Sequence, residues 1–416
     1  MSKKETLEEI RGNIQELESY FKKLEQSMEN NAKENLNPSI KGGVYWLINA
    51  QNEDGGFGIK KNEPSNIHLT AFALFALSKA GLRAGEDEAI DKALKYLKKT
   101  QNEEGWWGYE EDDTIGSVGV TSMIIQAFNI LGIKRSEPFY KKALNFIYEQ
   151  FSFERGCWRD NTYSEFGELS VNELAFGAIE GNLKGTKLEK FRELVIESIN
   201  PDDGYGWKFG DSESDIENTA IALKILKRLG FTTKDDLVKR AIRYILNSQD
   251  KTGGFPRKMQ FYGNSDAIEN DTTALVISGL IAIGLEPYHE AILKATDFLN
   301  KQQNCIVTNG TACVTIEEIQ NTNWGWGWGD KAGMPSDTDS TSLALMALID
   351  AGKGAVPLAV TQCKIAETRE FVNKFIERHV NELYDELKHM NRLNRLLELN
   401  IAILAILIPI ITIFLS

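Results

Sequence analysis

The stretch Gln51-Asn-Glu-Asp-Gly-Gly-Phe-Gly58 recurs along this chain and decides its fold. A close copy stands at Gln101-Asn-Glu-Glu-Gly-Trp-Trp-Gly108, and a third begins at Gln249 as Gln-Asp-Lys-Thr-Gly-Gly-Phe255. Weaker copies, in which glycine stands beside an aromatic residue, are Gly156-Cys-Trp158, Gly204-Tyr-Gly-Trp207 and Trp324-Gly-Trp-Gly-Trp-Gly329. Self-similarity at a period of about 50 residues indicates a repeat architecture.

A small, apolar, nearly uncharged helical pattern follows each loop, as in Thr70-Ala-Phe-Ala-Leu-Phe-Ala-Leu77. A helix that is apolar all round is buried on all sides. Each such helix carries a Thr or Ser near its start and a Gly eleven residues later. The six pairs are Thr70/Gly81, Thr121/Gly132, Ser170/Gly181, Thr219/Gly230, Thr273/Gly284 and Thr341/Gly352. We expect each glycine just after the helix end, in the left-handed conformation that disfavours a residue with a Cβ.

The helical pattern before each loop is amphipathic. Ala93–Gln101 and Ala241–Asn247 place apolar residues at i, i+3 and i+4, with Lys or Arg between them. Each unit therefore contains one outer, half-solvated helix and one inner, fully packed helix. The sequence predicts an all-α fold, in which residues 37–355 form an α6–α6 toroid of six helical hairpins in two concentric rings.

Two coiled-coil-like helices flank the repeats. The first spans residues 1–30, and the second forms a helical stalk at 364–398. Their seams follow a 3-4 spacing. The first is Leu7, Ile10, Ile14, Leu17, Phe21, Leu24 and Met28. The second is Ile376, Val380, Leu383, Leu387, Met390, Asn394 and Leu397, in which the polar Asn394 costs stability but fixes the register. The seams could pair within one chain or between two chains of a homodimer, since both arrangements satisfy the pattern.

The C-terminal segment 399–416 contains the uncharged apolar run 401–415. Its length is close to the lower limit for a transmembrane helix, about 17 residues. Lys388, Arg392 and Arg395 precede it, which favours a cytoplasmic position for the N-terminal side. We therefore expect a C-terminal membrane anchor that holds the toroid on the cytoplasmic side.

Charge and cysteine usage narrow the range of partners and cofactors. The net charge of −13, without a basic stripe, disfavours nucleic-acid binding. The four cysteines, at 157, 305, 313 and 363, form no Cys-x-x-Cys pair and have no histidine at zinc spacing. We expect no metal and no cofactor.

The glutamine-aromatic loops on repeated helical hairpins resemble the repeats of squalene–hopene cyclases and of protein prenyltransferase β-subunits. The resemblance covers all six repeats. It implies that Gln51, Gln101 and Gln249 brace the barrel by bonding helix ends to their neighbours. Protein prenyltransferases bind zinc through Asp, Cys and His in late repeats, but the inner helices of repeats five and six here carry no Cys or His.

Class II terpene cyclases carry the motif Asp-x-Asp-Asp-Thr, whose middle Asp protonates an alkene or epoxide. Repeat six resembles this motif as Asp337-Thr-Asp339-Ser-Thr341, with Ser340 in place of the last Asp. Repeats four and five depart further, as Asp215-Ile-Glu217-Asn-Thr219 and Glu269-Asn-Asp271-Thr-Thr273. The resemblance implies catalytic roles for Asp339 and Asp337.

Protonating a C=C bond requires a carboxyl group that stays neutral, which burial and a second nearby carboxylate promote. The resulting carbocation requires aromatic walls and exclusion of water. The residues two positions before each Thr or Ser predict a ring of polar groups at one rim of the barrel. The predicted substrate-binding residues are Glu217, Asp271, Glu168, His68, Trp107 and Trp326.

The same residues have simpler interpretations. Ser214 and Glu217 form a capping-box spacing, and acids in a first turn complement the helix dipole. The tryptophans could serve packing alone. We therefore keep two hypotheses: a membrane-anchored terpene-cyclase-like protein that cyclises a polyprenyl substrate by acid initiation, and a catalytically inactive toroid that binds a lipid or a protein.

Overall fold

The computed structural model describes residues 38–160, 167–257, 267–303, 307–308, 311–312, 325–327 and 336–352. These residues belong to one of two compact units of the chain, formed by Asn37–Cys313 and Ile319–Val360. The predicted helix 1–30, stalk 364–398 and anchor 399–416 lie outside the described residues. Within the described ranges, no helix has the length and apolar character needed to cross a membrane.

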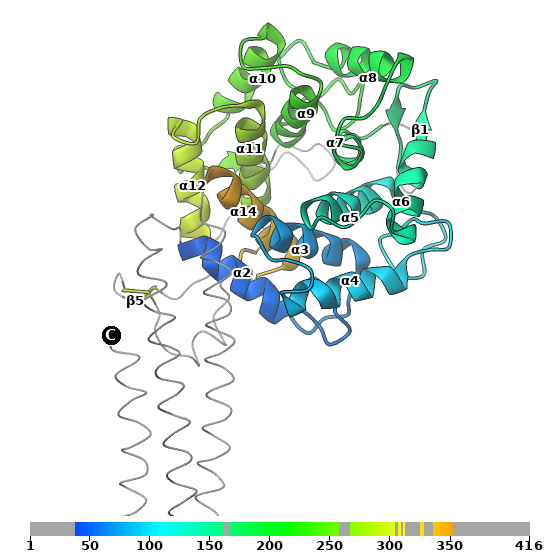
Figure 1. Ribbon diagram of the computed structural model, residues 1–416. Coiled ribbons are helices and arrows are strands. Elements are labelled where there is room, and N and C mark those ends of the chain that lie inside the picture. Colours follow the sequence, from blue (N-terminus) through cyan, green and yellow to red (C-terminus); the bar gives the residue numbers. More distant parts are fainter. Residues whose placement is uncertain are drawn as a thin grey trace, which may run out of the picture. The chain divides into compact units, whose positions relative to one another are not determined.

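In the part of the chain that the structure describes, six helices form a closed inner ring (Figure 1). Each packs against the next in chain order, and the last, α14, packs against the first, α3. The inner helices are α3 (Ile67–Lys79), α5 (Val118–Ile130), α7 (Leu169–Ala178), α9 (Ile216–Arg228), α11 (Asn270–Ile283) and α14 (Thr338–Ala351). Most of their residues are buried, as their nearly uniform apolar composition predicts.

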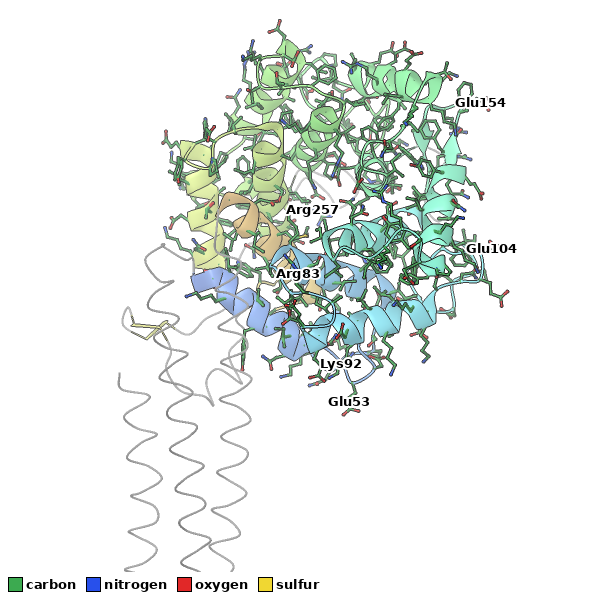
Figure 2. The ribbon with its side chains drawn as sticks, in the orientation of Figure 1. Glu53, Arg83, Lys92, Glu104, Glu154 and Arg257 are labelled. Atoms are coloured by element: carbon green, nitrogen blue, oxygen red, sulfur yellow. The ribbon has the colours of Figure 1, made fainter. Side chains whose placement is uncertain are left out.

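Six amphipathic helices surround this ring: α2 (Pro38–Ala50), α4 (Glu88–Thr100), α6 (Pro138–Glu149), α8 (Thr186–Glu197), α10 (Asp236–Leu246) and α12 (Glu290–Gln302). Charged side chains such as Lys92 and Glu104 lie at the periphery, whereas Arg257 lies toward the centre (Figure 2). The predicted α6–α6 toroid is confirmed. The pairing within it differs from expectation, because inner helices pack mainly against the outer helix that follows, and α2 packs against α14.

The described loops contain three short antiparallel strand pairs. They are β1 (Phe151–Ser152) with β2 (Cys157–Trp158), β3 (Phe255–Pro256) with β4 (Ile268–Glu269), and β5 (Val307–Thr308) with β6 (Thr311–Ala312). In the second pair, Phe255 lies opposite Glu269, so a loop aromatic residue is joined to the start of the next inner helix.

The repeated Thr anchors the aromatic loop to the inner helix. The backbone N–H of Trp107 donates to Thr121 Oγ1 at 3.0 Å, and that of Phe57 donates to Thr70 Oγ1 at 2.9 Å. Equivalent bonds are made by Thr219, Thr273 and Thr341. In repeat three the acceptor is Asn172, which receives the N–H of Trp158 at 2.9 Å. The register predicted there from Ser170 is therefore wrong by two residues.

The glycines after the inner helices largely behave as predicted. Gly81, Gly132, Gly181, Gly230 and Gly284 have φ between +69° and +111°. Gly352 is the exception, with φ of −109°. A positive φ at these positions is strained for residues with a Cβ, which explains the repeated choice of glycine.

The predicted bracing glutamines are confirmed, and a further one closes the ring. Gln51 Nε2 donates to the backbone oxygens of Gly55 and Ala89, at 3.0 and 2.8 Å. Gln101 and Gln249 make the same two bonds in their own repeats. Gln303, which the repeat pattern did not predict, donates to Ser39 O at 2.9 Å and thereby joins the end of α12 to the start of α2.

Candidate active site

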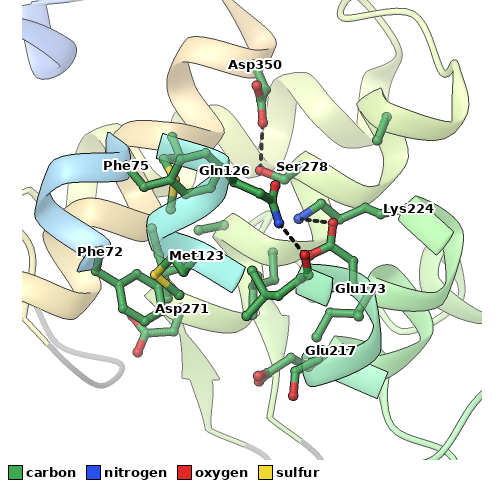
Figure 3. A pocket seen from close by; sticks show the side chains of 18 of the residues that line it. Phe72, Phe75, Met123, Gln126, Glu173, Glu217, Lys224, Asp271, Ser278 and Asp350 are labelled. Atoms are coloured by element: carbon green, nitrogen blue, oxygen red, sulfur yellow. Dashed lines mark hydrogen bonds and ion pairs between the residues drawn. The ribbon is translucent and has the colours of Figure 1, made fainter. Parts of the chain in front are cut away.

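A cavity of about 600 Å³ lies inside the inner ring, and all six inner helices contribute side chains to its wall (Figure 3). This volume is within the usual range for small-molecule sites, about 300 to 1,000 Å³. The predicted barrel interior is therefore open enough to hold a ligand. The wall combines apolar residues in the middle with charged groups toward the two ends of the helices.

Three acids, Glu217, Asp271 and Asp339, line one end of this cavity, which we call the acid end. Each is the second residue of its helix, in α9, α11 and α14. The helices begin at corresponding positions of the repeat, so the same turn points the three side chains inward. Figure 3 shows Glu217 and Asp271 at one end of the cavity and Asp350 at the other.

Asp337, predicted to be catalytic, is the N-cap of α14. Its carboxylate accepts from the backbone N–H of Ser340 at 2.7 Å and from the Ser340 hydroxyl at 3.1 Å. It is not among the residues that line the cavity. Asp215 caps α9 in the same way, by accepting from Asn218 N. The two acids of the repeat-six motif therefore occupy different places, one at the helix cap and one facing the cavity.

Burial makes Asp339 and Asp271 weak acids. Burial raises the pKa of Asp339 to about 7, and the charges of Asp337 and Glu217 add to the effect. The pKa of Asp271 is raised well above its usual range by burial and by Asp339. Within the described part of the chain, one oxygen of each carboxyl group has no hydrogen-bond partner. A pair of this kind retains a proton near neutral pH.

Hydroxyl groups link neighbouring acids around the acid end. Thr272 Oγ1 donates to Glu217 Oε2 at 3.4 Å, and the Ser340 hydroxyl contacts the carboxyl groups of both Asp337 and Asp271. Burial raises the pKa of Glu217, while Arg257 opposes the shift. Ser340, which replaces the last Asp of the cyclase motif, therefore connects the motif to Asp271 on the neighbouring helix.

Glu168 does not reach the cavity, because the register of repeat three was misassigned. It is the N-cap of α7, and Ser170 occupies the position that faces the cavity. Burial, together with the charge of Asp160, raises the pKa of Glu168 to about 7. Its Oε1 has no hydrogen-bond partner among the described residues.

His68 stands at the position of α3 that corresponds to Asp339, but it is not part of the cavity wall. Its ring lies edge-on to Phe72, with centroids 4.9 Å apart, and 5.1 Å from the ring of Tyr109. Burial lowers the pKa of His68 to about 4, so it is neutral at physiological pH.

Trp107 and Trp326 are fully buried outside the cavity wall. Their indole N–H groups donate to Leu97 O and Leu299 O, both at 2.8 Å, at the ends of outer helices. Phe72 and Phe75 are the aromatic residues on the described wall of the cavity. Their positions on the inward face of α3 could have indicated them, but the apolar pattern of that helix predicted packing alone.

Charged groups at the opposite end of the inner helices were also missed. Lys79 and Asp350 form an ion pair of 2.6 Å, and Ser278 Oγ donates to Asp350 at 3.0 Å. Lys224 and Arg228 both pair with Glu173. Burial alone would raise the pKa of Glu173, but these two cations lower it to about 2. Among the described residues, no group of three or more His, Cys, Asp or Glu is arranged to hold a metal ion.

Family models match most of the repeat region. The squalene–hopene cyclase C-terminal domain matches residues 22–116 and 211–365, which is more than half of the chain. The chain belongs to this family. The prenyltransferase α–α toroid domain matches residues 118–261, which fill the gap between those two segments and overlap the second of them. The terpene-cyclase-like relationship inferred from the glutamine-aromatic loops is thus confirmed.

This chain matches only part of the length of each curated relative. Squalene–hopene cyclase of Zymomonas mobilis is 33% identical over 170 residues, which are 38% of this chain and 25% of that protein. Thioester-containing protein 1 (allele S3) of Anopheles gambiae is 24% identical over 218 residues, 49% of this chain and 15% of that protein. This chain thus spans a quarter or less of these curated relatives.

Solved structures support the fold. The type II terpene cyclase MstE from Scytonema matches with a TM-score of 0.53 at 16% identity, covering 76% of this chain and 97% of that chain. At this level of identity the likeness concerns the toroid fold alone.

Proposed function

We propose that this protein cyclises an isoprenoid substrate and that Asp339 starts the reaction by protonating a C=C bond. The observation that carries this proposal is the position of Asp339. Its carboxyl group lines a cavity of about 600 Å³, and burial raises its pKa to about 7. A general acid works best when its pKa lies near the working pH.

In the proposed step, the O–H bond of Asp339 breaks and its proton adds to one alkene carbon. The π electrons form the new C–H bond, so the other alkene carbon becomes a carbocation and Asp339 becomes a carboxylate. Attack by further C=C bonds of the same chain closes the rings. The last cation loses a proton or captures water, and Asp339 regains a proton from solvent.

Asp271 supplies the second carboxyl group that the motif of repeat six lacks. It faces the same cavity, is electrostatically coupled to Asp339, and contacts the Ser340 hydroxyl. A close second carboxyl group keeps one proton on the pair. The departure from the family motif at Ser340 is therefore compatible with acid-initiated chemistry.

The apolar wall suits a hydrocarbon chain and a carbocation. Phe72, Phe75 and Met123 line the cavity, and Ile221 and Leu343 add aliphatic surface. Aromatic faces attract cations, by about 0.5 to 2 kcal/mol each. The solved cyclase MstE binds geranylgeranyl dihydroxybenzoate as substrate and merosterolic acid A as product. That protein's ligands support an isoprenoid as the ligand class for the cavity of this chain.

The alternative remains a catalytically inactive toroid that binds a lipid or a protein. The substitution of Ser340 for the last motif Asp favours it, as does the partial match to the Anopheles thioester-containing protein. The observation against it is the open cavity lined by two buried acids, Asp271 and Asp339, whose pKa values are raised by burial.

We propose in addition that the apolar run 401–415 anchors the toroid to a membrane on the cytoplasmic side. An apolar substrate is stored in membranes, so an anchored enzyme would meet it there. Deletion of residues 399–416 is expected to release the protein into the supernatant. A truncated protein that still sediments with membranes at high salt would contradict the anchor.

The predicted seams at 1–30 and 364–398 extend the proposal to a homodimer. A Leu383→Asp/Leu387→Asp variant tests it, and we expect this variant to lose self-association in a sedimentation experiment.

Incubation with farnesyl diphosphate, geranylgeranyl diphosphate and squalene, followed by mass spectrometry, tests the proposed reaction. We expect cyclic products from the wild type and at least about 100-fold slower formation by Asp339→Asn, because a positioned general acid contributes at least that much. Asp236→Asn is the matched control, since Asp236 is an exposed first-turn acid of the outer helix α10. Equal turnover by both variants would contradict the role of Asp339, and no product from any isoprenoid would favour the binding toroid.

A further inference from the structure

Two cations on α9 face the cavity at the end away from the three acids. Lys224 Nζ lies 3.5 Å from Glu173 Oε1, and Arg228 Nη1 donates to that same oxygen. The side chain of Glu173 is 5% exposed, whereas those of Lys224 and Arg228 are 24% and 29% exposed. Among the described residues, Glu173 is the one partner of both cations. We call Lys224, Arg228 and Gln126 the basic end of the cavity.

Gly177 leaves room for this group. A Cβ at position 177 would lie 2.7 Å from Gln126 Nε2 and 2.8 Å from Arg228 Nη2, which is too close for a real contact. The last turn of α7 is thus shaped so that an amide and a guanidinium group approach its backbone. Gln126 Nε2 donates to Leu174 O at 2.9 Å, which holds the amide beside the cations.

The favourable interaction of cations with a helix C-terminus explains only some of the cations at this end of the cavity. Lys79 and Arg228 lie in the last turns of α3 and α9, where cations are favoured. Lys224 lies one turn earlier. Lys79 is neutralised by Asp350 at 2.6 Å, while two cations share the single charge of Glu173. One positive charge at this end of the cavity therefore remains without a compensating carboxylate among the described residues.

We propose that the basic end binds the anionic head group, a diphosphate or a carboxylate, of the isoprenoid substrate. This inference rests on the proposed function and specifies its substrate class. Lys224 and Arg228 follow Glu217 by seven and eleven residues on α9. At 1.5 Å per residue they lie roughly 10 and 16 Å along the helix from the acid end. A head group held there directs the hydrocarbon chain along the apolar wall, with its far end toward Asp339.

The variant Lys224→Met tests the proposal in the full-length protein. It removes one charge but leaves Glu173 paired with Arg228, so the fold should survive. Lys227→Met is the matched control, because Lys227 is an exposed residue of the same helix that does not line the cavity. The dissociation constants of geranylgeranyl diphosphate, geranylgeranoic acid, geranylgeraniol and squalene are measured by equilibrium binding.

We expect Lys224→Met to weaken binding of the diphosphate or the acid at least about tenfold, because a charge-assisted hydrogen bond is lost. Lys227→Met should change it by less than about twofold, and geranylgeraniol binding should be the same in both variants. Raising the salt concentration should weaken binding of the anionic ligand to the wild type. The salt dependence uses the wild-type protein, so it tests the proposal even if Lys224→Met does not fold.

Geranylgeraniol or squalene binding as tightly as the anionic isoprenoids would overturn the head-group proposal, and so would equal effects of the two lysine variants. Cyclisation of squalene alone would overturn it while leaving the proposed reaction intact. Salt-sensitive binding of an anionic isoprenoid without any product would support the head-group site and contradict the cyclase. Preference for the diphosphate over the acid, or the reverse, identifies which oxyanion the basic end accepts.

Discussion

At the scale of single residues, two neighbouring acids of one motif behave differently because a helix begins between them. Asp337 is the N-cap of α14, and its carboxylate oxygens accept hydrogen bonds from Ser340 in the first turn. Asp339, two residues later, faces the cavity. The sequence placed both in one catalytic motif. The distinction required the exact start of the helix, which sequence patterns locate poorly.

Asp339→Asn should make stability less dependent on pH. Because burial raises the pKa of Asp339 from 3.8 to about 7, the folded state holds a proton that the unfolded state releases between these values. The stability linked to that proton is present below about pH 4 and is lost as pH rises through about 7. Between pH 5 and pH 8 we expect the free energy of unfolding to fall further in the wild type than in Asp339→Asn, by on the order of 1 to 3 kcal/mol.

Urea unfolding at both pH values measures this difference, and Asp236→Asn serves again as the control. Parallel pH profiles for wild type and Asp339→Asn would show that Asp339 is ionised in the folded protein at pH 5.

Ser340→Asp should be harmful although it restores the family motif. Ser340 is 1% exposed and already contacts Asp337 and Asp271, so a third carboxyl group there would be buried against two others. We expect a loss of at least about 2 kcal/mol, because an uncompensated buried charge is costly. If Asp271 substitutes for the missing Asp, adding Asp271→Ser should restore most of that loss.

Melting and unfolding of the two single variants and the double variant form a double-mutant cycle. Additive effects in this cycle would contradict a functional exchange between positions 271 and 340.

Other residues show where the sequence predicted the site correctly and where it did not. Glu217, Asp271 and Asp339 were brought together as predicted, because the same repeat position faces inward in α9, α11 and α14. Glu168 was misplaced since Asn172, rather than a Thr, anchors the loop of repeat three. Trp107 was misjudged because a loop position alone does not say whether an indole faces the cavity or the space between the rings.

At the scale of elements, the inner helix and the preceding aromatic loop form one unit. The bond from the Trp107 N–H to Thr121 Oγ1 lies in the buried region between the loop and α5. Equivalent bonds occur in every repeat, with Asn172 replacing Thr in the third. The repeated Thr therefore serves structure, which frees the inward-facing position two residues earlier to vary between repeats.

Thr121→Val keeps the shape of the side chain but removes the acceptor of the buried Trp107 N–H. We expect a loss of about 1 to 3 kcal/mol, which is the cost of an unsatisfied buried donor. Thr296→Val on the outer helix α12 is the control, because the Thr296 hydroxyl only donates back to Ile292 O within its own helix. Its cost should stay below about 1 kcal/mol. Equal costs for the two variants, from urea unfolding, would contradict the anchoring role.

The sequence predicted inner and outer helices correctly because periodicity reports how many sides of a helix are buried. It did not predict which outer helix packs against which inner helix. Both neighbours along the chain present the same apolar stripe, and the choice depends on the path of the loops in space. The packing of α2 against α14 involves the two ends of the repeat region, which no local pattern reveals.

At the scale of the toroid, ring closure is the feature that turns six hairpins into a cavity. Gln303 repeats the bond of Gln51, Gln101 and Gln249, but its acceptor Ser39 lies 264 residues earlier. The glutamine side chain therefore joins consecutive repeats at three positions, whereas at position 303 it joins the last outer helix to the first.

Gln303→Ala should lower the free energy of unfolding by about 0.5 to 1.5 kcal/mol, because the buried hydrogen bond from Gln303 to the Ser39 carbonyl is lost. Gln249→Ala is the matched control for the same bond between sequential repeats. If closure holds the ring together as one cooperative unit, both variants should unfold in a single transition with similar losses. An early, separate transition in Gln303→Ala alone, seen by tryptophan fluorescence and circular dichroism, would show that the ring opens at this junction.

The central claim is that Asp339 delivers a solvent-exchangeable proton to carbon, and turnover in heavy water tests it most directly. Before each turnover the carboxyl group of Asp339 exchanges its proton with solvent. Mass spectrometry of the cyclic product formed in D2O should therefore show one carbon-bound deuterium, and Asp339→Asn should form at least about 100-fold less of that product. A cyclic product without carbon-bound deuterium, or full turnover by Asp339→Asn, would contradict the account.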